Sequence, residues 1–465
     1  MAFAKTLRQV TVILLAAGLA LSMGSGGLLS TAAAGSRDNE PHVLVGLAKT
    51  KSVSLGFSQD YRLAAGQTTH QIPPQSSVRL ESRRGKISVT VSSAASVTFE
   101  AQLDSPVLIS PSYESSTAYF TIRDQGNTST GFPGQEFRGS AVIFEDQGTL
   151  TVANLVGLEE YLWSVVSSEM PCSWPKQALK AQAVVSRTYA VYTGAITDTA
   201  DATNIDAIRI WANESHQVYR GKTNEDPRAV EACMETKGQI LTYQGMPVAA
   251  YFHADSAGMT ESVRFVWGGD IPYLAAVEEI PHESHHSQWE VAFDLEILNQ
   301  KLSGVLPGSR IDMISGCQPG DSGRWFCVDI KAGNRTANVR ATQFRYLLEL
   351  KSTWFSIFRK GGGRDTIGQL NPGHEIYVDN GTSVQPVPLK QCIMLNSGGK
   401  RNTLGGAWVI APGQPGPATF VFQGRGYGHG VGLSQWGAKA MAERGDDYKQ
   451  ILTHYYPLTH IEAWW

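Results

Sequence analysis

The fold is decided by the stretch Leu158-Glu-Glu-Tyr-Leu-Trp-Ser-Val-Val-Ser-Ser-Glu-Met-Pro171, which continues as Cys-Ser-Trp-Pro-Lys-Gln-Ala-Leu-Lys-Ala-Gln-Ala-Val-Val-Ser-Arg-Thr-Tyr-Ala-Val-Tyr192. Apolar residues from Leu158 to Val166 recur at helical spacing, which predicts an amphipathic helix that stops at Pro171. A second helix is predicted to follow, with Ser173 or Trp174 near its cap and Pro175 in its first turn. We therefore expect two consecutive helices joined by a short turn.

The regions on either side of these helices are rich in predicted strands. On the N-terminal side, the runs 43–47, 87–91 and 119–122 are short, apolar and separated by turn residues. On the C-terminal side, strands are mixed with one short predicted helix, residues 342–350. The expected fold class is α+β. A helical core made by the helix-turn-helix packs with mixed β-structure, and a β-rich region precedes it.

The N-terminus is expected to be a signal peptide. Lys5 and Arg8 precede an apolar run of roughly 14 residues and a small-residue segment that ends near Gly35. We predict a signal peptide at 1–34, a β-rich region at 35–150 and a catalytic domain at 151–465, with an inserted subdomain at about 284–418. The alternative to cleavage is an uncleaved N-terminal anchor. The mature chain is expected outside the cytoplasm (secreted, periplasmic or cell-wall associated), with no stable membrane span.

Charge and cysteine usage narrow the classes of partner and site. Removing the signal takes away two positive charges, so the formal net charge of -3 becomes about -5. No basic stripe is present, which argues against a nucleic-acid partner. The 5 cysteines match no zinc signature, since no pair stands as C-x-x-C. Cys317 and Cys327 flank a turn-rich loop and form the predicted disulfide.

Glu169 is the principal candidate for acid/base chemistry. It ends the first helix, just before a turn that contains Trp174. A carboxyl held among Met, Trp and Tyr side chains is expected to have a raised pKa, as a general acid at neutral pH requires. Lys180 and Arg187 lie seven residues apart, on nearly the same face of the second helix, where they could orient Glu169 or bind a ligand. The alternative is an ordinary glutamate in a last helical turn.

The stretch from Gly424 to Gly437 is the second candidate region. Its alternating glycines allow a backbone to approach a ligand closely, and its side chains suit a sugar-binding groove. The candidate binding residues there are Tyr427, His429, Gln435 and Trp436. The alternative is a tight turn whose glycines serve only to pack a strand against a helix.

Two further arrangements are weaker. Ser256, His429 and Asp255 could form a serine-hydrolase set, but no G-x-S-x-G motif supports it. His282, His285 and His286 cluster with Glu283, without the spacing of a metal-binding helix. For the histidine cluster we favour a solvated polar loop, and we expect no metal and no cofactor.

Seven segments occur in a characteristic order: Leu158–Pro171, Trp174–Tyr189, His216–Gly221, Tyr251–Gly258, Pro272–Leu274, Gly426–Ala438 and His454–Pro457. Together they resemble the sporulation protein D and amidase-enhancer (SpoIID/LytB) family. The resemblance implies lytic cleavage of peptidoglycan glycan strands, best known for strands already stripped of their stem peptides, with Glu169 as general acid/base. It also implies that Lys180 and Arg187 matter.

The resemblance leaves a second role open and departs from the family at one point. The amidase-enhancer branch implies a non-catalytic glycan-binding protein whose partner is a cell-wall amidase. Some relatives bind zinc through Cys and His just before the Gln-x-Tyr-x-Gly segment. Here residues 206–217 contain His216 but no cysteine, so that metal is not expected.

Overall fold

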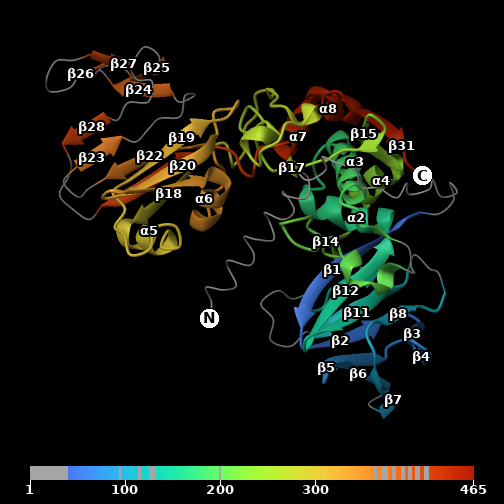
Figure 1. Ribbon diagram of the computed structural model, residues 1–465. Coiled ribbons are helices and arrows are strands. Elements are labelled where there is room, and N and C mark those ends of the chain that lie inside the picture. The colour runs from blue at the N-terminus through green and yellow to red at the C-terminus, as the bar shows by residue number, and fades with distance from the viewer. Residues whose placement is uncertain are drawn as a thin grey trace. The chain divides into compact units, whose positions relative to one another are not determined.

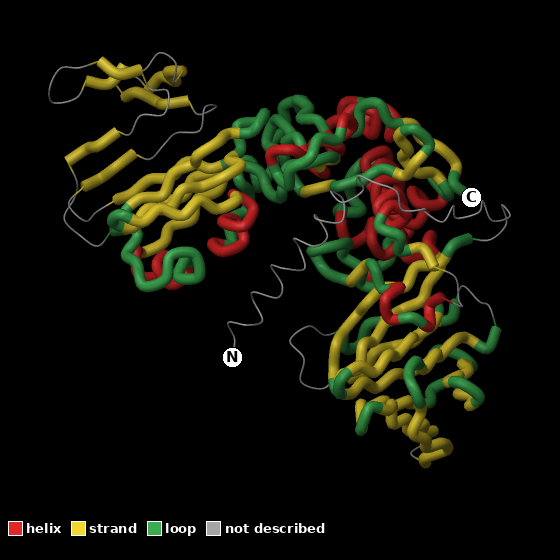
Figure 2. Tube along the Cα trace, in the orientation of Figure 1, coloured by secondary structure: helices red, strands yellow, loops and turns green. Residues whose placement is uncertain are grey.

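The computed structural model describes residues 40–93, 96–113, 117–124, 132–197, 201–360 and 418–465, together with the backbone of six strands between 364 and 412. The chain divides into two compact units. Unit 1 runs to Ala250 and includes Gly445–Ile451 and Thr459–Trp465, whereas unit 2 comprises Tyr251–Arg444 and Leu452–Leu458. The chain combines helices with strands that form several separate sheets, so the prediction of an α+β fold is confirmed (Figures 1 and 2).

The described residues of unit 1 form two large sheets and one small sheet. The first has the order β13-β1-β12-β11-β8-β3-β4, with β14 paired to β1. Its strands are β1 (His42–Thr50), β3 (Tyr61–Ala65), β4 (Thr68–Ile72), β8 (Val107–Pro111), β11 (Ser140–Asp146), β12 (Thr149–Gly157), β13 (Ile196–Thr197) and β14 (Ile210–Trp211). The second has the order β10-β9-β2-β5-β6-β7. Its strands are β2 (Ser52–Phe57), β5 (Ser77–Arg83), β6 (Lys86–Ser93), β7 (Ser96–Leu103), β9 (Tyr119–Asp124) and β10 (Glu136–Arg138).

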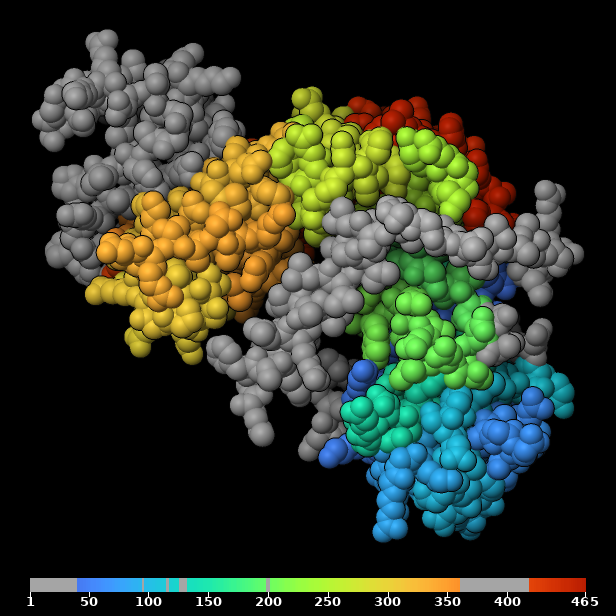
Figure 3. Space-filling model, viewed as in Figure 1, coloured from blue at the N-terminus to red at the C-terminus, as the bar shows by residue number. Residues whose placement is uncertain are grey.

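The helices of unit 1 lie together beside one end of these strands (Figure 1). They are α2 (Leu158–Glu169), α3 (Lys176–Tyr192) and α4 (Pro227–Glu235), and α8 (Tyr448–Tyr455) begins in this unit. The small sheet has the order β16-β15-β31, formed by β16 (Met246–Pro247), β15 (Gln239–Tyr243) and β31 (His460–Ala463). In Figure 3 the surface of this unit continues from the blue and cyan strands to the green helices.

In its described residues, unit 2 contains short sheets, three α-helices of its own and the end of α8. A five-stranded sheet has the order β18-β29-β22-β23-β28, and a three-stranded sheet has the order β19-β20-β21. The strands are β17 (Phe252–His253), β18 (Trp289–Asp294), β19 (Met313–Pro319), β20 (Trp325–Ala332), β21 (Arg335–Arg340), β22 (Phe355–Lys360), β23 (Arg364–Ile367), β24 (Glu375–Asp379), β25 (Val384–Pro388), β26 (Ile393–Leu395), β27 (Arg401–Thr403), β28 (Val409–Pro412), β29 (Thr419–Gly424) and β30 (Leu433–Ser434). The helices are α5 (Leu295–Lys301), α6 (Ala341–Leu348) and α7 (Gln435–Arg444).

Several sequence predictions can be compared with these elements. The predicted strands 43–47, 87–91 and 119–122 lie within β1, β6 and β9, and the short predicted helix corresponds to α6. The Cys317–Cys327 disulfide is confirmed. The predicted signal peptide and Cys392 lie outside the described residues, and the predicted domain boundaries stay predictions. Among the described helices, none is long and apolar enough to cross a membrane.

The two predicted central helices form where expected. The apolar stripe of α2 is buried, from Leu158 to Val166, and the helix ends when Met170 becomes extended. Pro171 explains this end, since a residue before proline is pushed out of the helical region. Pro175 is the N-cap of α3, so this helix starts slightly later than the predicted first turn. Its alanines at 178, 181, 183 and 190 are buried, which lets neighbouring elements approach closely.

A buried ion pair joins α2 to α3. The Arg187 guanidinium donates from Nε to Oε1 of Glu159 at 2.9 Å and from Nη2 to Oε2 at 2.7 Å, and both side chains are almost fully buried. Arg187 also donates to the carbonyl oxygens of Gln239 and Cys233 at 3.2 and 3.3 Å. One side chain thus links α2, α3, α4 and β15. A bidentate pair has the geometry needed to offset the cost of burying both charges.

We expect Glu159→Gln to lower the free energy of unfolding of unit 1 by about 3–5 kcal/mol, because it leaves the Arg187 charge buried without a counterion. Urea denaturation followed by circular dichroism measures this change. Lys86→Met, which removes the exposed Lys86–Asp104 pair of the same unit, is the matched control and should cost about 1 kcal/mol or less. Equal effects of the two substitutions would contradict the structural role of the buried pair.

Candidate functional site

Glu169 lies at the C-terminal end of α2, half-buried, between the buried Met170 and the rest of the helix. The backbone N–H of Val218 donates to its Oε1 at 2.8 Å. That hydrogen bond fixes one carboxylate oxygen while part of the side chain remains accessible to solvent. Glu169 is therefore held in a defined position at a helix end, as a group that transfers protons must be.

The segment 217–226, which contains the Val218 N–H that binds Glu169, is anchored to α2 by several hydrogen bonds. The N–H groups of Arg220 and Asp226 donate to the hydroxyls of Ser164 and Ser167, both at 3.0 Å. The Asn224 side-chain amide donates to the Ser168 hydroxyl at 2.9 Å. Successive α2 serines thus satisfy donors of the neighbouring segment, which keeps the backbone beside Glu169 in place.

Alternating residues of this segment point inward. Gln217 and Tyr219 are buried: the Tyr161 hydroxyl donates to Gln217 at 2.8 Å, and the Tyr219 hydroxyl donates to Asn154 at 2.6 Å. Gly221 has a φ of +69°, and a Cβ there would lie 2.3 Å from the Glu136 carbonyl oxygen, so only glycine fits. The Gln-x-Tyr-x-Gly spacing is therefore required by packing between β-sheet and helices.

The Lys180 side chain of α3 is held by contacts with Glu235 and Tyr448. Its Nζ lies 3.1 Å from Oε2 of Glu235 and 4.5 Å from the ring centroid of Tyr448. Its side chain is 14% exposed. Lys180 therefore presents a held ammonium group that is still partly accessible, and its ion-pair partner is Glu235.

Arg187 is not at a surface. Its guanidinium is fully buried, and its hydrogen bonds go to Glu159 and to backbone carbonyls. In this arrangement it neither orients Glu169 directly nor offers a donor to a ligand, unlike the role expected from helix geometry. Helix spacing puts Lys180 and Arg187 on one face correctly, but it does not reveal that a buried carboxylate occupies the Arg187 end of that face.

Glu160, next to Glu159, is a carboxyl that the sequence analysis did not single out. Burial, with the nearby Glu40 and Glu225 carboxylates, raises the pKa of Glu160 to about 7, against an opposing effect of Arg138. Arg138 itself is engaged by Glu225 at 2.6 Å. The sequence gives no signal for this shift, because the neighbouring charges come from distant parts of the chain.

In unit 2 the glycine-rich loop, residues 424–437, lies against the segment 251–256. Asp255 and Tyr427 exchange backbone hydrogen bonds at 3.1 and 2.9 Å, and β30 pairs with β17 in parallel. Gly432 has a φ of +71°, and a Cβ there would lie 2.0 Å from the Tyr251 carbonyl oxygen. Close packing of two backbones therefore accounts for this glycine, which agrees with the packing alternative considered for the loop.

The four candidate binding residues of this loop differ in exposure. Tyr427 is 39% exposed and stacks on His286 with ring centroids 4.8 Å apart. Trp436 is half-buried and Gln435 is nearly buried. His429 packs against Trp267, and burial lowers the pKa of His429 to about 3, so its ring is neutral at pH 7. Of this set, Tyr427 is exposed and Trp436 is partly accessible, so both present ring surface to solvent.

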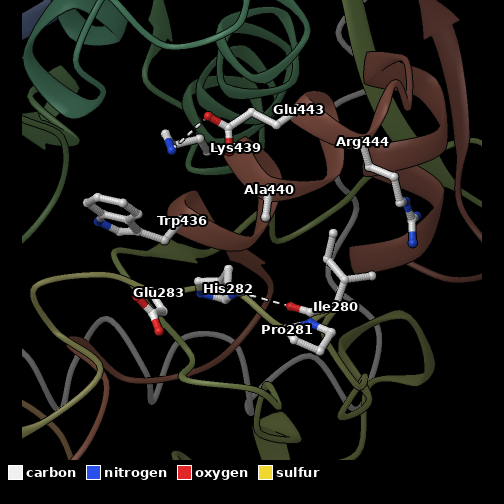
Figure 4. A pocket seen from close by; sticks show the side chains of 9 residues that line it. All are labelled: Ile280, Pro281, His282, Glu283, Trp436, Lys439, Ala440, Glu443 and Arg444. Carbon is white, nitrogen blue, oxygen red and sulfur yellow. Dashed lines mark hydrogen bonds and ion pairs between the residues drawn. The ribbon is translucent and has the colours of Figure 1, made fainter.

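A pocket of about 600 Å³ lies beside Trp436 (Figure 4). One wall comes from α7 and the other from the loop that precedes β18. The lining residues are Ile280, Pro281, His282, Glu283, Trp436, Lys439, Ala440, Glu443 and Arg444. An aromatic ring, two acidic and two basic side chains and an imidazole make a surface suited to a polar ligand.

His282 departs from the solvated loop predicted for it. Its side chain is 7% exposed and its Nε2 lies 3.1 Å from Oδ1 of Asp255. The paired Asp255 raises the pKa of His282 to about 9 against the effect of burial. His285 by contrast is exposed, and His286 stacks on Tyr427. The His285 and His286 rings lie with their centroids 3.9 Å apart, whereas His282 is paired with Asp255, so the predicted cluster is divided in two.

The hydrogen bonds of a Ser-His-Asp triad do not link Ser256, His429 and Asp255. Ser256 Oγ lies 2.7 Å from Nε2 of His253, and Asp255 bonds to His282 and Ser284. Ser256 is fully buried as well. A buried hydroxyl bonded to a buried imidazole stabilises the loop rather than attacking a substrate.

The zinc site of some relatives is not reproduced around His216. Within the described part of the chain, the one group of His, Cys, Asp and Glu side chains close enough to share an ion is Asp255, Glu279 and His282. His216 is not in it, and burial lowers the pKa of His216. The residues before the Gln-x-Tyr-x-Gly segment therefore do not fit a zinc ion.

Residues 146–243 match the family model described as "Stage II sporulation protein". This chain carries a SpoIID-family domain. The resemblance predicted from the sequence motifs is thus confirmed, and the matched residues include Glu169, Lys180, Arg187 and the segment 216–221. The glycine-rich loop lies outside the matched residues of the SpoIID-family domain.

Relatives of this chain are similar over much of its length. It is 28% identical over 320 residues to Stage II sporulation protein D of Bacillus amyloliquefaciens, covering 65% of this chain and 73% of that one. It is 29% identical over 307 residues to the Amidase enhancer of Bacillus subtilis, covering 65% of this chain but only 40% of that protein. An uncharacterized protein of Brachyspira hyodysenteriae is 29% identical over 335 residues, 71% of this chain and 73% of that one.

The raised pKa of Glu160 predicts a pH dependence of stability. Between pH 4.5, the ordinary value, and about 7, the folded state keeps a proton that the unfolded state releases, so stability falls as pH rises through this window. Glu160→Gln should remove this loss and gain roughly 1–3 kcal/mol on wild type between pH 4 and pH 8. Urea denaturation at both pH values measures it. The exposed Glu214→Gln is the control, and a parallel pH profile for wild type and Glu160→Gln would refute the assignment.

Proposed function

We propose that this chain acts outside the cytoplasm on peptidoglycan glycan strands, as a lytic transglycosylase in cell-wall remodelling. The observation that carries the proposal is Glu169, a half-buried carboxyl at a helix end whose Oε1 is held by the Val218 N–H. It occupies the Ser-Glu-Met-Pro motif of the SpoIID-family domain. One positioned carboxyl is sufficient for this reaction class.

The proposed mechanism uses Glu169 first as an acid and then as a base. Its protonated carboxyl gives a proton to the oxygen that links N-acetylmuramic acid to N-acetylglucosamine, and the C1–O bond breaks. The resulting carboxylate takes the proton of the C6 hydroxyl of the same muramic acid, whose oxygen bonds to C1 and closes a 1,6-anhydro ring. Because no water attacks, the second carboxylate of hydrolytic glycosidases is not needed. Positioned proton transfer of this kind contributes roughly 10²–10⁴-fold to a rate.

The neighbouring charged residues have different parts in this proposal. Lys180 is a partly accessible ammonium group held by Glu235, and it is suited to bind sugar hydroxyls. Arg187 contributes through the Glu159 pair that fixes α2 against α3, and so acts on the position of Glu169 indirectly. The sites in unit 2, Tyr427 and Trp436, are proposed to bind sugar rings by stacking.

The second candidate function is a non-catalytic glycan-binding protein that stimulates a cell-wall amidase. The similarity to the Amidase enhancer of Bacillus subtilis favours it, although this chain spans only 40% of that protein. Arg187 is buried and so cannot contact a ligand, which is compatible with this second function too. An enhancer would need the glycan-binding side chains but not the Glu169 proton.

Mass spectrometry of soluble products, after incubation with intact and amidase-treated sacculi, tests the catalytic proposal. Wild type should release products that end in 1,6-anhydro-N-acetylmuramic acid, mainly from the amidase-treated sacculi. Glu169→Gln keeps the shape of the side chain but cannot donate and accept the proton, so its products should fall at least about 100-fold. Glu231→Gln, on the exposed face of α4, is the matched control and should leave the product yield unchanged.

The other outcomes distinguish the alternatives. Products with reducing ends would mean hydrolysis by water. Full activity of a folded Glu169→Gln protein would exclude Glu169 as the acid. No products from either substrate, with sacculus binding retained and amidase stimulation observed, would replace the enzyme with the enhancer.

Binding of sacculi tests the ring surfaces of unit 2. Tyr427→Ala and Trp436→Ala should each weaken sacculus binding by roughly five- to tenfold, since losing one stacking ring removes about 1–1.4 kcal/mol. Pull-down with titrated sacculi measures the change. Tyr346→Ala is the matched control, because Tyr346 is a 55% exposed tyrosine of the same unit. Unchanged binding by both variants would remove the glycine-rich loop from the proposed glycan site.

A further inference from the structure

Asp255, Glu279 and His282 come together in unit 2, although their positions in the chain give no metal-binding motif. One ligand atom of each lies within 4.8 Å of the others. His282 Nε2 and Asp255 Oδ1 are 3.1 Å apart, close to the separation of two ligands on one tetrahedral ion. Two ligands of one ion, each about 2.1 Å from it, are at most about 4.2 Å apart, so small side-chain rotations bring all three to one ion.

The imidazole is already oriented as a metal ligand. His282 Nδ1 lies 3.1 Å from the carbonyl oxygen of Ile280, which as acceptor fixes the proton on Nδ1. Nε2 then faces Asp255 with its lone pair available once its proton has left for solvent. A histidine whose second ring nitrogen donates to a backbone carbonyl is the usual arrangement in metal sites.

Both carboxylates also have outer partners that hold them. The Ala257 N–H donates to Asp255 Oδ1 at 2.7 Å, and the Ser284 hydroxyl donates to Oδ2. The Tyr455 hydroxyl donates to Glu279 Oε1 at 2.7 Å, and the Gly258 N–H donates to Oε2 at 3.3 Å. Every candidate ligand therefore has a supporting hydrogen bond, which pre-organises a site of this kind.

The backbone that carries the ligands is itself paired. Residues Gly258 and Thr260 exchange hydrogen bonds with Val277 and Glu279 at 2.9 Å. The loop that carries Glu279 and His282 therefore lies beside the segment that carries Asp255. Ligands on hydrogen-bonded backbone keep their separation better than ligands on an open loop.

Charge favours a cation at this position. Two carboxylates and one imidazolium leave one negative charge in a partly buried site, whereas two carboxylates, a neutral imidazole and a divalent ion sum to zero. Arg324 and Glu261 are two further buried groups of opposite charge that share the Ser322 hydroxyl, and Arg324 also interacts electrostatically with Glu279 and Asp255. An uncompensated buried charge is costly, so neutralising it contributes to binding.

We propose that Asp255, Glu279 and His282 form a binding site for a divalent first-row transition ion such as Zn²⁺ or Mn²⁺. One nitrogen and two carboxylate oxygens suit these ions better than Mg²⁺ or Ca²⁺, which prefer oxygen ligands alone. His282 also lines the pocket beside Trp436, which supplies an entry path (Figure 4). The ion would hold one wall of that pocket to the segment that contacts the glycine-rich loop.

Metal binding by the full chain, purified without a histidine tag and stripped with a chelator, tests this site. Isothermal titration with ZnCl₂ and MnCl₂ should give one ion per chain and a higher melting temperature, and MgCl₂ should give neither. His282→Gln and Glu279→Gln should each weaken binding at least about tenfold and abolish the melting shift. His285→Gln, an exposed histidine of the same loop, is the matched control and should bind as wild type does.

The outcomes separate this proposal from its rivals and from the proposed catalytic role. No stoichiometric binding by wild type would overturn it and leave a metal-free ion-paired network. Equal loss in His285→Gln, or full binding by both ligand variants, would overturn it as well, since the ion would then sit on other residues. Glu169→Gln should bind the ion normally, so an inactive Glu169 variant and a failed metal site are independent results.

Discussion

The buried pair between Glu159 and Arg187 is the constraint on which unit 1 depends. Two charges without solvent are tolerated only because the guanidinium meets both carboxylate oxygens and its remaining donors meet backbone carbonyls. That requirement leaves α2, α3, α4 and β15 little freedom to shift relative to one another. Glu169 ends the same helix that carries Glu159, so the position of its carboxyl depends on this pair ten residues earlier in the chain.

The same constraint divides the motif residues into two groups. Gln217, Tyr219 and Gly221 are required by packing, because two are buried and hydrogen-bonded and the third has no room for a Cβ. Glu169 and Lys180 remain partly accessible, so a ligand can contact them. Most of these motif residues therefore hold the helices in place, and few of them are accessible for chemistry.

In unit 2, as in unit 1, many of the motif residues serve packing. Its glycines allow two backbones to pack at close range, and the buried polar groups beneath them, such as Asp255 and His282, are hydrogen-bonded to one another. What remains at the surface is aromatic and polar, from Tyr427 to the pocket beside Trp436. The two proposed functions, enzyme and amidase enhancer, both use such a surface to bind glycan, and they differ in the proton transfer proposed for Glu169.

The sequence by itself determined the local elements: α2 and α3 from apolar spacing, the strands from short apolar runs between turn residues, and the Cys317–Cys327 disulfide from a short turn-rich loop. These depend on residues close in the chain. The tertiary structure alone decided that Arg187 is buried against a carboxylate 28 residues away, and that His282 meets an aspartate 27 residues away. Burial, pKa and ligand geometry depend on which distant segments pack together, and residue spacing along one element carries no record of that.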